Sequence, residues 1–425
     1  MSLIKNVEFL RNLSKLHQVN GLADLLRPTA NSPLVEVTGF GSNPGDLRML
    51  SFVPTGLQQP PALVVVLHGC GQTAGGYDLG AGWSTLAERY GFALLMPEQQ
   101  RTNNPQGCFN WFNPEDTARD QGEACSIRQM IARMVADHGI DKHRIFVTGL
   151  SAGGAMTSVM LATYPEVFAA GAVIAGLPYG VASNVREALS GMLQSPSRPA
   201  GELGDLVRNA SKHRGSWPKL SVWHGSADRT VNPANANEIV KQWLDVHQLP
   251  AAPMSEGMVD GYPHQVWWNA DGETIVESYT ITNMAHGTPL GIADNDERYG
   301  AEGAFLIEAG ISSSYHIASF FGLTERISQP RTAEAAHKAT NPKPQPSMPL
   351  RTPDVAAVLQ PLAVLHRAAD TQAKAKTNAK SNAQANAKAK AGPKAQPEQK
   401  SQSRRRAIDV GAVITRALTA AGLMK

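Results

Sequence analysis

Ser151 lies at the centre of the segment GLSAG, residues 149–153. This GxSxG pattern is typical of a nucleophile elbow, a tight turn between a strand and a helix that exposes the serine hydroxyl. The glycines remove Cβ atoms that would collide in such a turn. An apolar run at 144–148 precedes the motif, and a helical pattern over 155–163 follows it. We therefore predict that Ser151 is the nucleophile of a hydrolase.

Asp228 and His286 supply the carboxylate and the imidazole that a serine nucleophile needs. A serine hydroxyl reacts poorly at neutral pH, so an imidazole must take its proton and a carboxylate must hold that imidazole. Both residues follow strand-like segments, in WHGSADRTV and NMAHGTPL, and the order Ser, Asp, His is that of the α/β-hydrolase fold. We predict Asp228 as the orienting acid and His286 as the general base. Other histidines and acids fit less well because of their spacing or their place on a loop or helical run: His224, His264, His316, Asp245 and Asp260.

An ester hydrolase must also stabilise the oxyanion of its tetrahedral intermediate with backbone N–H groups. The N–H that follows the nucleophile belongs to Ala152, and a second loop, after the apolar run 63–67, begins with His68, Gly69 and Cys70. We predict an oxyanion hole formed by the N–H groups of Ala152 and Cys70, with His68 as a structural histidine. The three cysteines form no CxxC pair, and no His-x-Glu metal-binding motif accompanies them. We therefore expect no metal and no cofactor.

The elements that must position these residues follow an alternating pattern from residue 47 to residue 323. Short apolar runs alternate with amphipathic stretches, which predicts an α/β fold with a mostly parallel sheet and helices on both faces. The runs predicted as strands are 63–67, 92–96, 144–148, 170–175, 220–223 and 277–281. Helical periodicity covers 122–138 and 155–163. The segment 177–217 breaks the pattern with Gly, Ser, Pro and mixed charges, and we interpret it as a lid or cap insertion.

The chain is predicted to have four regions. These are an N-terminal amphipathic helical extension (1–40), a catalytic domain (41–324), a disordered Pro/Ala/Lys-rich linker (325–406) and a short C-terminal amphipathic helix (407–425). The formal net charge is +3, but residues 371–406 carry ten Lys or Arg against one Glu, so they contribute +9 and the rest of the chain −6. The basic character therefore belongs to the tail, and we expect no nucleic-acid partner for the catalytic domain.

Hydrophobic residues make up 42% and charged residues 18% of the chain, as in an ordinary soluble globular protein. We expect no membrane span, because no apolar stretch of about 18 residues occurs. The first eighteen residues carry charges throughout and lack the apolar core of a secretory signal, so we expect no signal peptide.

Several sequence blocks closely resemble those of the polyhydroxybutyrate depolymerase family of esterases, the short-chain polyhydroxyalkanoate depolymerase type. They include HGCGQTAGGYD, NNPQGCFNWF, GLSAGGAM, ATYPEVFAAGAVIAGLPYG, SVWHGSADRTV and MAHGTPL, in the family's order. The resemblance implies an α/β-hydrolase fold and hydrolysis of poly(3-hydroxybutyrate) or its oligomers by Ser151, Asp228 and His286. It also implies a disulfide between Cys70 and Cys108. Esterases that release feruloyl or acetyl groups share this fold and triad, so they stay open as an alternative, as does a general short-chain carboxylesterase.

Further expectations concern what the protein contacts. Trp111 and Tyr179 lie in predicted loops and are candidates for binding an apolar polyester chain, with core packing as the alternative. The predicted C-terminal helix could hold the enzyme at a hydrophobic granule, or dock on the catalytic domain. The resemblance implies an extracellular location, whereas the lack of a visible signal leaves a cytoplasmic or granule-associated one open. A non-catalytic scaffold with a binding tail is disfavoured by the complete triad.

Overall fold

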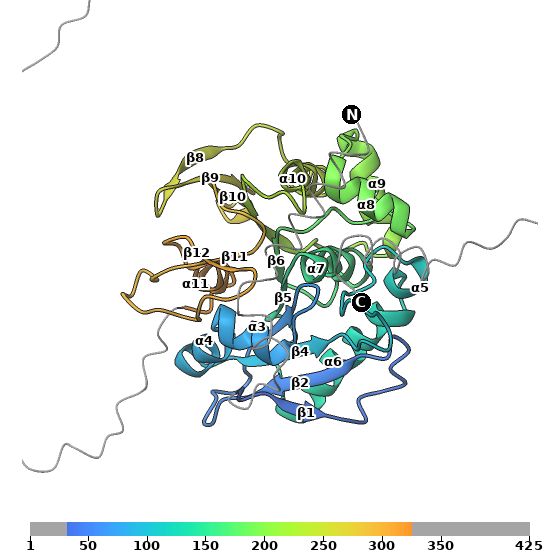
Figure 1. Cartoon of the computed structure of the whole chain (residues 1–425), viewed down its shortest axis with the longest axis vertical. Helices are drawn as coiled ribbons and strands as arrows, with labels where there is room; N and C mark the ends of the chain where they lie inside the picture. The colour runs from blue at the N-terminus through green and yellow to red at the C-terminus, as the bar shows by residue number, and fades with distance from the viewer. Residues whose placement is uncertain (1–31, 325–425) are drawn as a thin grey trace, which may run out of the picture. The chain divides into compact units, whose positions relative to one another are not determined.

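A computed structural model describes residues 32–324 of the chain (Figure 1). The predictions of a helix near the N-terminus, of a disordered linker and of a C-terminal helix all concern residues outside this range. Residues 32–40 were predicted as part of the helical extension, but this is wrong for Val35–Val37, which form strand β1 and pair with Met49–Ser51. The sheet therefore begins before the predicted domain boundary at residue 41.

Ten strands form one sheet in the order β1-β2-β4-β3-β5-β6-β7-β10-β9-β8. Their bounds are β1 (Val35–Val37), β2 (Arg48–Phe52), β3 (Leu63–Leu67), β4 (Ala93–Glu98), β5 (Ile145–Leu150), β6 (Ala170–Ile174), β7 (Lys219–Gly225), β8 (Ser255–Val259), β9 (Tyr262–Trp268) and β10 (Thr274–Ile281). The strands from β4 to β10 in this order are parallel to one another, and β1, β2, β9 and β8 pair antiparallel at the two edges. The predicted mostly parallel sheet is confirmed.

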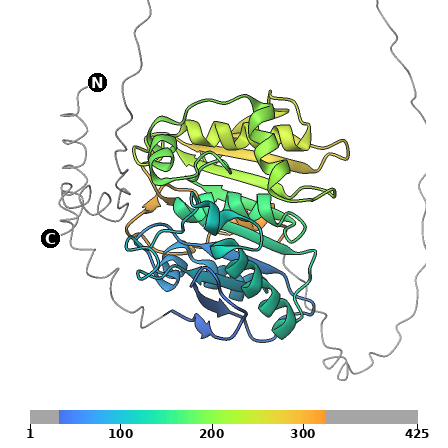
Figure 2. The ribbon, with the colours of Figure 1, turned by 90° about the vertical axis from the view of Figure 1, so that its right-hand side faces the viewer.

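Helices cover both faces of this sheet (Figures 1 and 2). Their bounds are α3 (Ala74–Ala81), α4 (Trp83–Tyr90), α5 (Pro114–Thr117), α6 (Gly122–His138), α7 (Ala152–Thr163), α8 (Val185–Gln194), α9 (Ala200–Ala210), α10 (Ala234–His247) and α11 (Ser313–Phe320). Strand β3 is buried along its whole length because it contributes to two cores. Leu63, Val65 and Leu67 pack with residues of α6, α7 and α10, whereas Val64 and Val66 pack with residues of α3, α4 and α11.

The insertion 177–217 contains two helices, α8 and α9, which the sequence pattern did not identify. Helix α9 packs against α10 and α7, and it buries Leu203 and Val207. At least the second half of the insertion is therefore part of the packed domain. Strands β11 (Thr288–Leu290) and β12 (Leu306–Glu308) form a separate parallel pair. None of the helices within residues 32–324 has the length and apolar character to cross a bilayer.

Candidate active site

Ser151 occupies the turn between β5 and α7, with φ 57° and ψ −115°. A positive φ is strained for a residue with a Cβ atom, and it persists where the surrounding structure fixes it. Here the glycines of the motif let the backbone segments meet. A Cβ on Gly149 would lie 2.5 Å from the carbonyl carbon of Gly153, and one on Gly153 would lie 2.2 Å from the carbonyl oxygen of Leu67. The elbow is thus wedged against the end of β3.

The structure brings together the three residues predicted as a triad. His286 Nε2 lies 2.9 Å from Ser151 Oγ, and His286 Nδ1 lies 2.7 Å from Asp228 Oδ2. A carboxylate can only accept, so Nδ1–H donates to Asp228 and the free lone pair of Nε2 can accept the Ser151 hydroxyl proton. All three residues are largely buried, with 9%, 8% and 5% of Ser151, His286 and Asp228 exposed. A neutral imidazole in this tautomer is the form that activates a serine.

These residues come from loops that are far apart in the chain. Asp228 follows β7, and His286 lies between β10 and β11, so both sit at the carboxyl end of parallel strands. Two further glycines allow the loops to approach. A Cβ on Gly225 would lie 2.3 Å from the carbonyl oxygen of Met284, and a Cβ on Gly287 would lie 2.8 Å from that of Phe305. Backbone contact therefore fixes the position of the histidine loop.

Asp228 accepts hydrogen bonds on both carboxylate oxygens. Oδ1 accepts the N–H groups of Thr230 and Val231, at 2.8 and 2.9 Å. Oδ2 accepts from His286 Nδ1 and also from His224 Nε2, at 3.1 Å. Burial raises the pKa of Asp228, but the hydrogen bonds from the two histidines outweigh it and hold the pKa well below its usual range. Asp228 is thus ionised throughout the neutral pH range.

His224 also belongs to this site, as a neighbour of Asp228 and not as a general base. Its Nε2 lies within 3.1 Å of Asp228 Oδ2 and 3.0 Å of the Val231 carbonyl oxygen. Both partners are acceptors, so Nε2 carries a proton. The other ring nitrogen, Nδ1, is buried without a hydrogen-bond partner among the described residues. The four-residue spacing between His224 and Asp228 was the available signal for this contact.

The loop predicted to complete an oxyanion hole lies against the elbow. A Cβ on Gly153 would be 2.6 Å from the carbonyl oxygen of His68, and one on Gly69 would be 3.4 Å from the Leu150 side chain. The N–H groups on either side of Cys70 are engaged, Gly69 with Gln72 Oε1 and Gly71 with Gln106 O, each at 2.8 Å. The Cys70 N–H donates to no group in residues 32–324.

Ala152, the other predicted oxyanion donor, is the first residue of α7. The N–H groups in the first turn of a helix have no intrahelical acceptor and carry the positive end of the helix dipole. The Ala152 N–H is therefore available to a developing negative charge beside Ser151.

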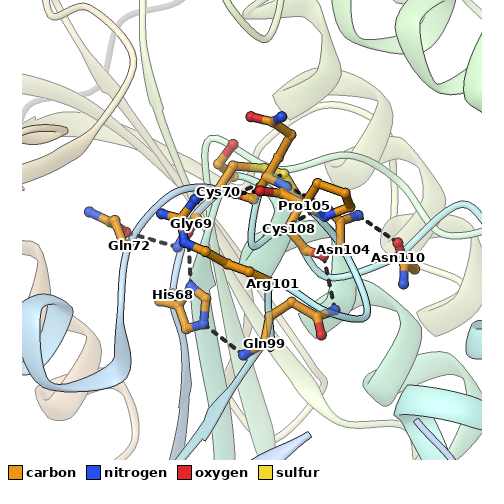
Figure 3. Close-up of a disulfide and its surroundings, with 12 residues drawn as sticks. His68, Gly69, Cys70, Gln72, Gln99, Arg101, Asn104, Pro105, Cys108 and Asn110 are labelled. Carbon is orange, nitrogen blue, oxygen red and sulfur yellow. Dashed lines mark hydrogen bonds between the residues drawn. A yellow bond between two sulfur atoms is a disulfide. The ribbon is translucent and has the colours of Figure 1, made fainter. Parts of the chain in front are cut away.

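His68 supports the loop that contains Gly69 and Cys70, which is called the oxyanion loop below (Figure 3). Its Nδ1–H donates to the carbonyl oxygen of Gly69 at 2.8 Å, and its Nε2 accepts the N–H of Gln99 at 3.1 Å. The ring is completely buried, and burial lowers its pKa, so His68 is neutral. Figure 3 also shows the disulfide between Cys70 and Cys108, with Cα atoms 4.2 Å apart. The structure thus contains the pairing that the family resemblance implies.

The two aromatic residues predicted to contact substrate have different surroundings. Trp111 belongs to the hydrophobic core, and its ring packs edge-on against Phe112 with centroids 5.5 Å apart. Tyr179 is half-buried, and its backbone N–H and carbonyl oxygen pair with the side-chain amide of Gln242. Within the described residues, neither makes a hydrogen bond or ring contact with the triad.

One group of residues could offer ligands to a cation. Asp260, Asp294 and His316 each bring one ligand atom within 4.8 Å of the others. His316 Nε2 lies 2.9 Å from Asp260 Oδ2, and both aspartates are exposed. The hydrogen bond links two of these three residues, and none of the triad residues belongs to the group.

The chain is similar to several known esterases. The family model described as esterase PHB depolymerase matches residues 49–254. Poly(3-hydroxyalkanoate) depolymerase C of Paucimonas lemoignei is 46% identical over 291 residues, which cover 68% of this chain and 70% of that protein. Feruloyl esterase B of Talaromyces stipitatus is 31% identical over 281 residues, covering 64% and 77%. A solved acetyl xylan esterase from Aspergillus awamori has a TM-score of 0.58 at 27% identity, covering 68% of this chain and 99% of its own.

These relatives are carboxylic ester hydrolases, and the parallel sheet with an elbow serine is the α/β-hydrolase arrangement. The identity to the Paucimonas enzyme extends over more than two thirds of both chains. The chain is therefore a carboxylic ester hydrolase with an α/β-hydrolase fold, and it belongs to the PHB depolymerase family of esterases.

Proposed function

We propose that Ser151, His286 and Asp228 act as the catalytic triad of this esterase. The observation that supports it most directly is the continuous hydrogen-bond chain from Ser151 Oγ through His286 to Asp228, at 2.9 and 2.7 Å. In this proposal, Ser151 Oγ attacks the ester carbonyl carbon while His286 Nε2 takes its proton. The backbone N–H groups of Ala152 and Cys70 stabilise the resulting oxyanion.

The tetrahedral intermediate then collapses to an acyl-enzyme. His286 passes its proton from Nε2 to the leaving alcohol oxygen as the bond between that oxygen and the acyl carbon breaks. A water molecule, deprotonated by the same nitrogen, attacks the acyl carbon, and Ser151 Oγ leaves with the proton. Asp228 keeps the imidazole in one tautomer and stabilises its charged form during both steps.

The substrate proposed here is poly(3-hydroxybutyrate) or its soluble oligomers. The support is the 46% identity to a poly(3-hydroxyalkanoate) depolymerase, compared with 31% to a feruloyl esterase. A second candidate is the release of feruloyl or acetyl groups from plant polysaccharides. The similarity to the acetyl xylan esterase, which this chain covers almost completely, favours that alternative.

Product analysis tests this choice of substrate. The full-length enzyme would be incubated with poly(3-hydroxybutyrate) film, a soluble hydroxybutyrate trimer, and an acetylated or feruloylated sugar, with Ser151→Ala protein as the blank. Release of hydroxybutyrate units at a higher kcat/KM than acetate or ferulate supports the polyester proposal. The reverse order of kcat/KM would make the chain a polysaccharide-directed esterase.

An additional proposal concerns the C-terminal segment, which lies outside the described residues. Val410, Ile414, Leu418 and Ala421 can share one face of a helix. Such a face, joined to the catalytic domain by the chain between, would raise the enzyme's local concentration at a hydrophobic granule. Docking of the same face on the catalytic domain is the alternative outcome.

A further inference from the structure

The residue that precedes β12 is an aromatic one in an unusual backbone conformation. Residues 303–306 form a tight turn in which the Leu306 N–H donates to the Gly303 carbonyl oxygen at 3.1 Å. Phe305, the third residue of this turn, has φ 63°. A β-turn with positive φ at its third position normally carries glycine or asparagine there. This turn therefore places a bulky side chain where the backbone favours a small one.

Positive φ at Phe305 has no counterpart among the other bulky residues described. Eleven non-glycine residues in the described part of the chain have positive φ, and ten of them are Asn, Asp, Ser, Ala or Gln. Ser151 is one of these ten. Strained backbone conformations concentrate at functional sites, where the surrounding structure compensates for their cost. The strained backbone at Phe305 therefore points to a role for its ring.

The ring lies partly in solvent and against the general base of the proposed triad. Phe305 is 41% exposed, whereas most large aromatic side chains of residues 32–324 are buried. Its ring packs edge-to-face on the His286 imidazole, with centroids 5.8 Å apart and an interplanar angle of 75°. His286 is hydrogen-bonded to Ser151, so only the imidazole ring separates the exposed Phe305 ring from the proposed nucleophile.

Hydrogen bonds fix this turn to both halves of the site. The Thr288 N–H donates to the Phe305 carbonyl oxygen at 2.8 Å, which ties the turn to the loop of His286. The Gln72 side chain donates through Nε2 to the Ala304 carbonyl oxygen at 3.2 Å and accepts the Gly69 N–H at 2.8 Å. The Phe305 turn, the histidine loop and the oxyanion loop are thus one connected unit.

The chemistry of the proposed reaction decides which part of a substrate meets the ring. His286 Nε2 must reach the leaving alcohol oxygen to protonate it, so the alcohol portion of the ester lies on the histidine side of Ser151. The Phe305 ring packs against that histidine. We infer that Phe305 is a specificity-determining residue whose ring forms an apolar wall for the alcohol portion of the ester, which in a polyester is the next repeat unit. This inference rests on the proposed triad function.

The test compares two series of simple esters with Phe305→Gly enzyme. The first series consists of butyrate esters whose alcohol portion varies from methyl to butyl to 2-phenylethyl. The second consists of methyl esters whose acyl chain varies from acetyl to hexanoyl. We expect kcat/KM for 2-phenylethyl butyrate to fall about tenfold relative to methyl butyrate, the effect of a lost apolar contact. The ratios within the acyl series should change by less than about twofold.

Two further proteins make this test decisive. Phe305→Asn removes the ring but suits positive φ, so it should repeat the result if the glycine variant folds poorly. Trp268→Ala removes another exposed aromatic residue, on β9, and should alter neither series. An equal loss across both series, or a loss along the acyl series, would overturn the inference while the triad stands. If wild-type enzyme hydrolyses none of these esters, the proposed function itself fails.

Discussion

Asp228 accepts four hydrogen bonds, and this saturation determines how the site is organised. Two backbone N–H groups hold Oδ1, while His286 and His224 share Oδ2. A carboxylate held in this way cannot rotate without breaking several bonds, so the imidazole of His286 has one preferred orientation. Such positioning in advance of the reaction is a large part of how enzymes lower a barrier.

In the proposed mechanism Ser151 Oγ forms the acyl-enzyme, and Ser151→Ala removes that atom. We expect ester turnover to fall by about 10⁴ or more, as happens when a triad member is lost. The fold should persist, because the only side-chain hydrogen bond of Ser151 within residues 32–324 is the one to His286. Hydrolysis rates on the soluble hydroxybutyrate trimer would measure the loss of turnover, and circular dichroism would measure the retention of the fold. A serine-directed phosphonate should label Ser151 in the wild-type enzyme. Residual activity above about a thousandth of wild type would contradict the nucleophile assignment.

Replacing His224 by Leu removes one donor from Oδ2 of Asp228. Because this donor helps to fix a charged acceptor, we expect kcat/KM to fall about tenfold, corresponding to one charge-assisted hydrogen bond. His224→Gln keeps an N–H near the same position and should restore most of the activity.

His264 provides a matched control for this variant. Its Nε2 lies 3.0 Å from Glu277 Oε2, so it is another histidine bound to a carboxylate on the same sheet, outside the triad. His264→Leu should leave kcat/KM near wild type even if it lowers Tm. Equal losses of activity in the two leucine variants would show that His224 serves the fold alone.

At the scale of elements, the central strands and α6 were predictable because their sequence patterns are simple. Strand β3 is a run of five buried apolar residues, and α6 has the predicted bounds Gly122–His138. The hairpin of β8 and β9 was not predicted. Most of β8 is exposed, so no alternation of apolar and polar residues marks it, and pairing with the sheet edge determines its structure.

The candidate site divides in the same way between local and tertiary information. The sequence could predict the proposed triad, Ser151, Asp228 and His286, because the elbow motif and the strands before these residues are recognisable from short stretches of sequence. For His224, the only local signal was its four-residue spacing from Asp228, and the hydrogen bond itself forms across a folded loop. For Phe305 there was none, because no residue pattern specifies its backbone angle.

The disulfide joins the oxyanion loop to the loop that follows β4. Replacing Cys70 and Cys108 together by Ser opens a covalent loop with a sequence separation of 38 residues. We expect unfolding free energy to fall by about 3–4 kcal/mol, the chain-entropy value for this loop length. We also expect a lower kcat, because the Cys70 N–H loses an anchor. Urea titration and kinetics would measure these changes, and Cys125→Ser, which removes the free thiol, should show neither.

Asp78 connects helices α3 and α4 through a buried carboxyl group. Its Oδ1 accepts the Ser84 N–H at 2.7 Å, while Oδ2 has no partner among the described residues. Burial raises the pKa of Asp78 from 3.8 to about 6, against the lowering effect of Ser84. The folded state therefore favours the protonated form. Its contribution to stability is fully present below about pH 4 and is lost as the pH rises through about 6.

Asp78→Asn cannot ionise, so this loss should disappear. Relative to wild type, the variant should gain on the order of 2 kcal/mol of unfolding free energy between about pH 4 and about pH 7. Urea unfolding at several pH values would measure the difference, with the exposed Asp271→Asn as the control. A difference between variant and wild type that stays constant with pH would contradict the assignment.

At the scale of the whole molecule, the triad and every described strand lie before residue 325. Removing residues 325–425 should therefore change kcat/KM for the soluble trimer by less than about twofold. If the C-terminal segment anchors the enzyme, truncation should reduce co-sedimentation with amorphous polyester granules. Equal co-sedimentation of both proteins would exclude the anchor, and a lower Tm after truncation would favour docking on the catalytic domain.

The loops of the triad also set the order in which activity can return after unfolding. Ser151 and His286 are 135 residues apart, and the histidine loop is held by β12, near the end of the described chain. Contacts between distant residues form late because closing a long loop costs entropy before any contact is made. Helix α6 can form much earlier, because its backbone hydrogen bonds join residues that are close in the chain. During refolding, ester hydrolysis should therefore recover after most of the circular dichroism signal has returned. The time course of ester hydrolysis would then report when the histidine loop docks beside Ser151.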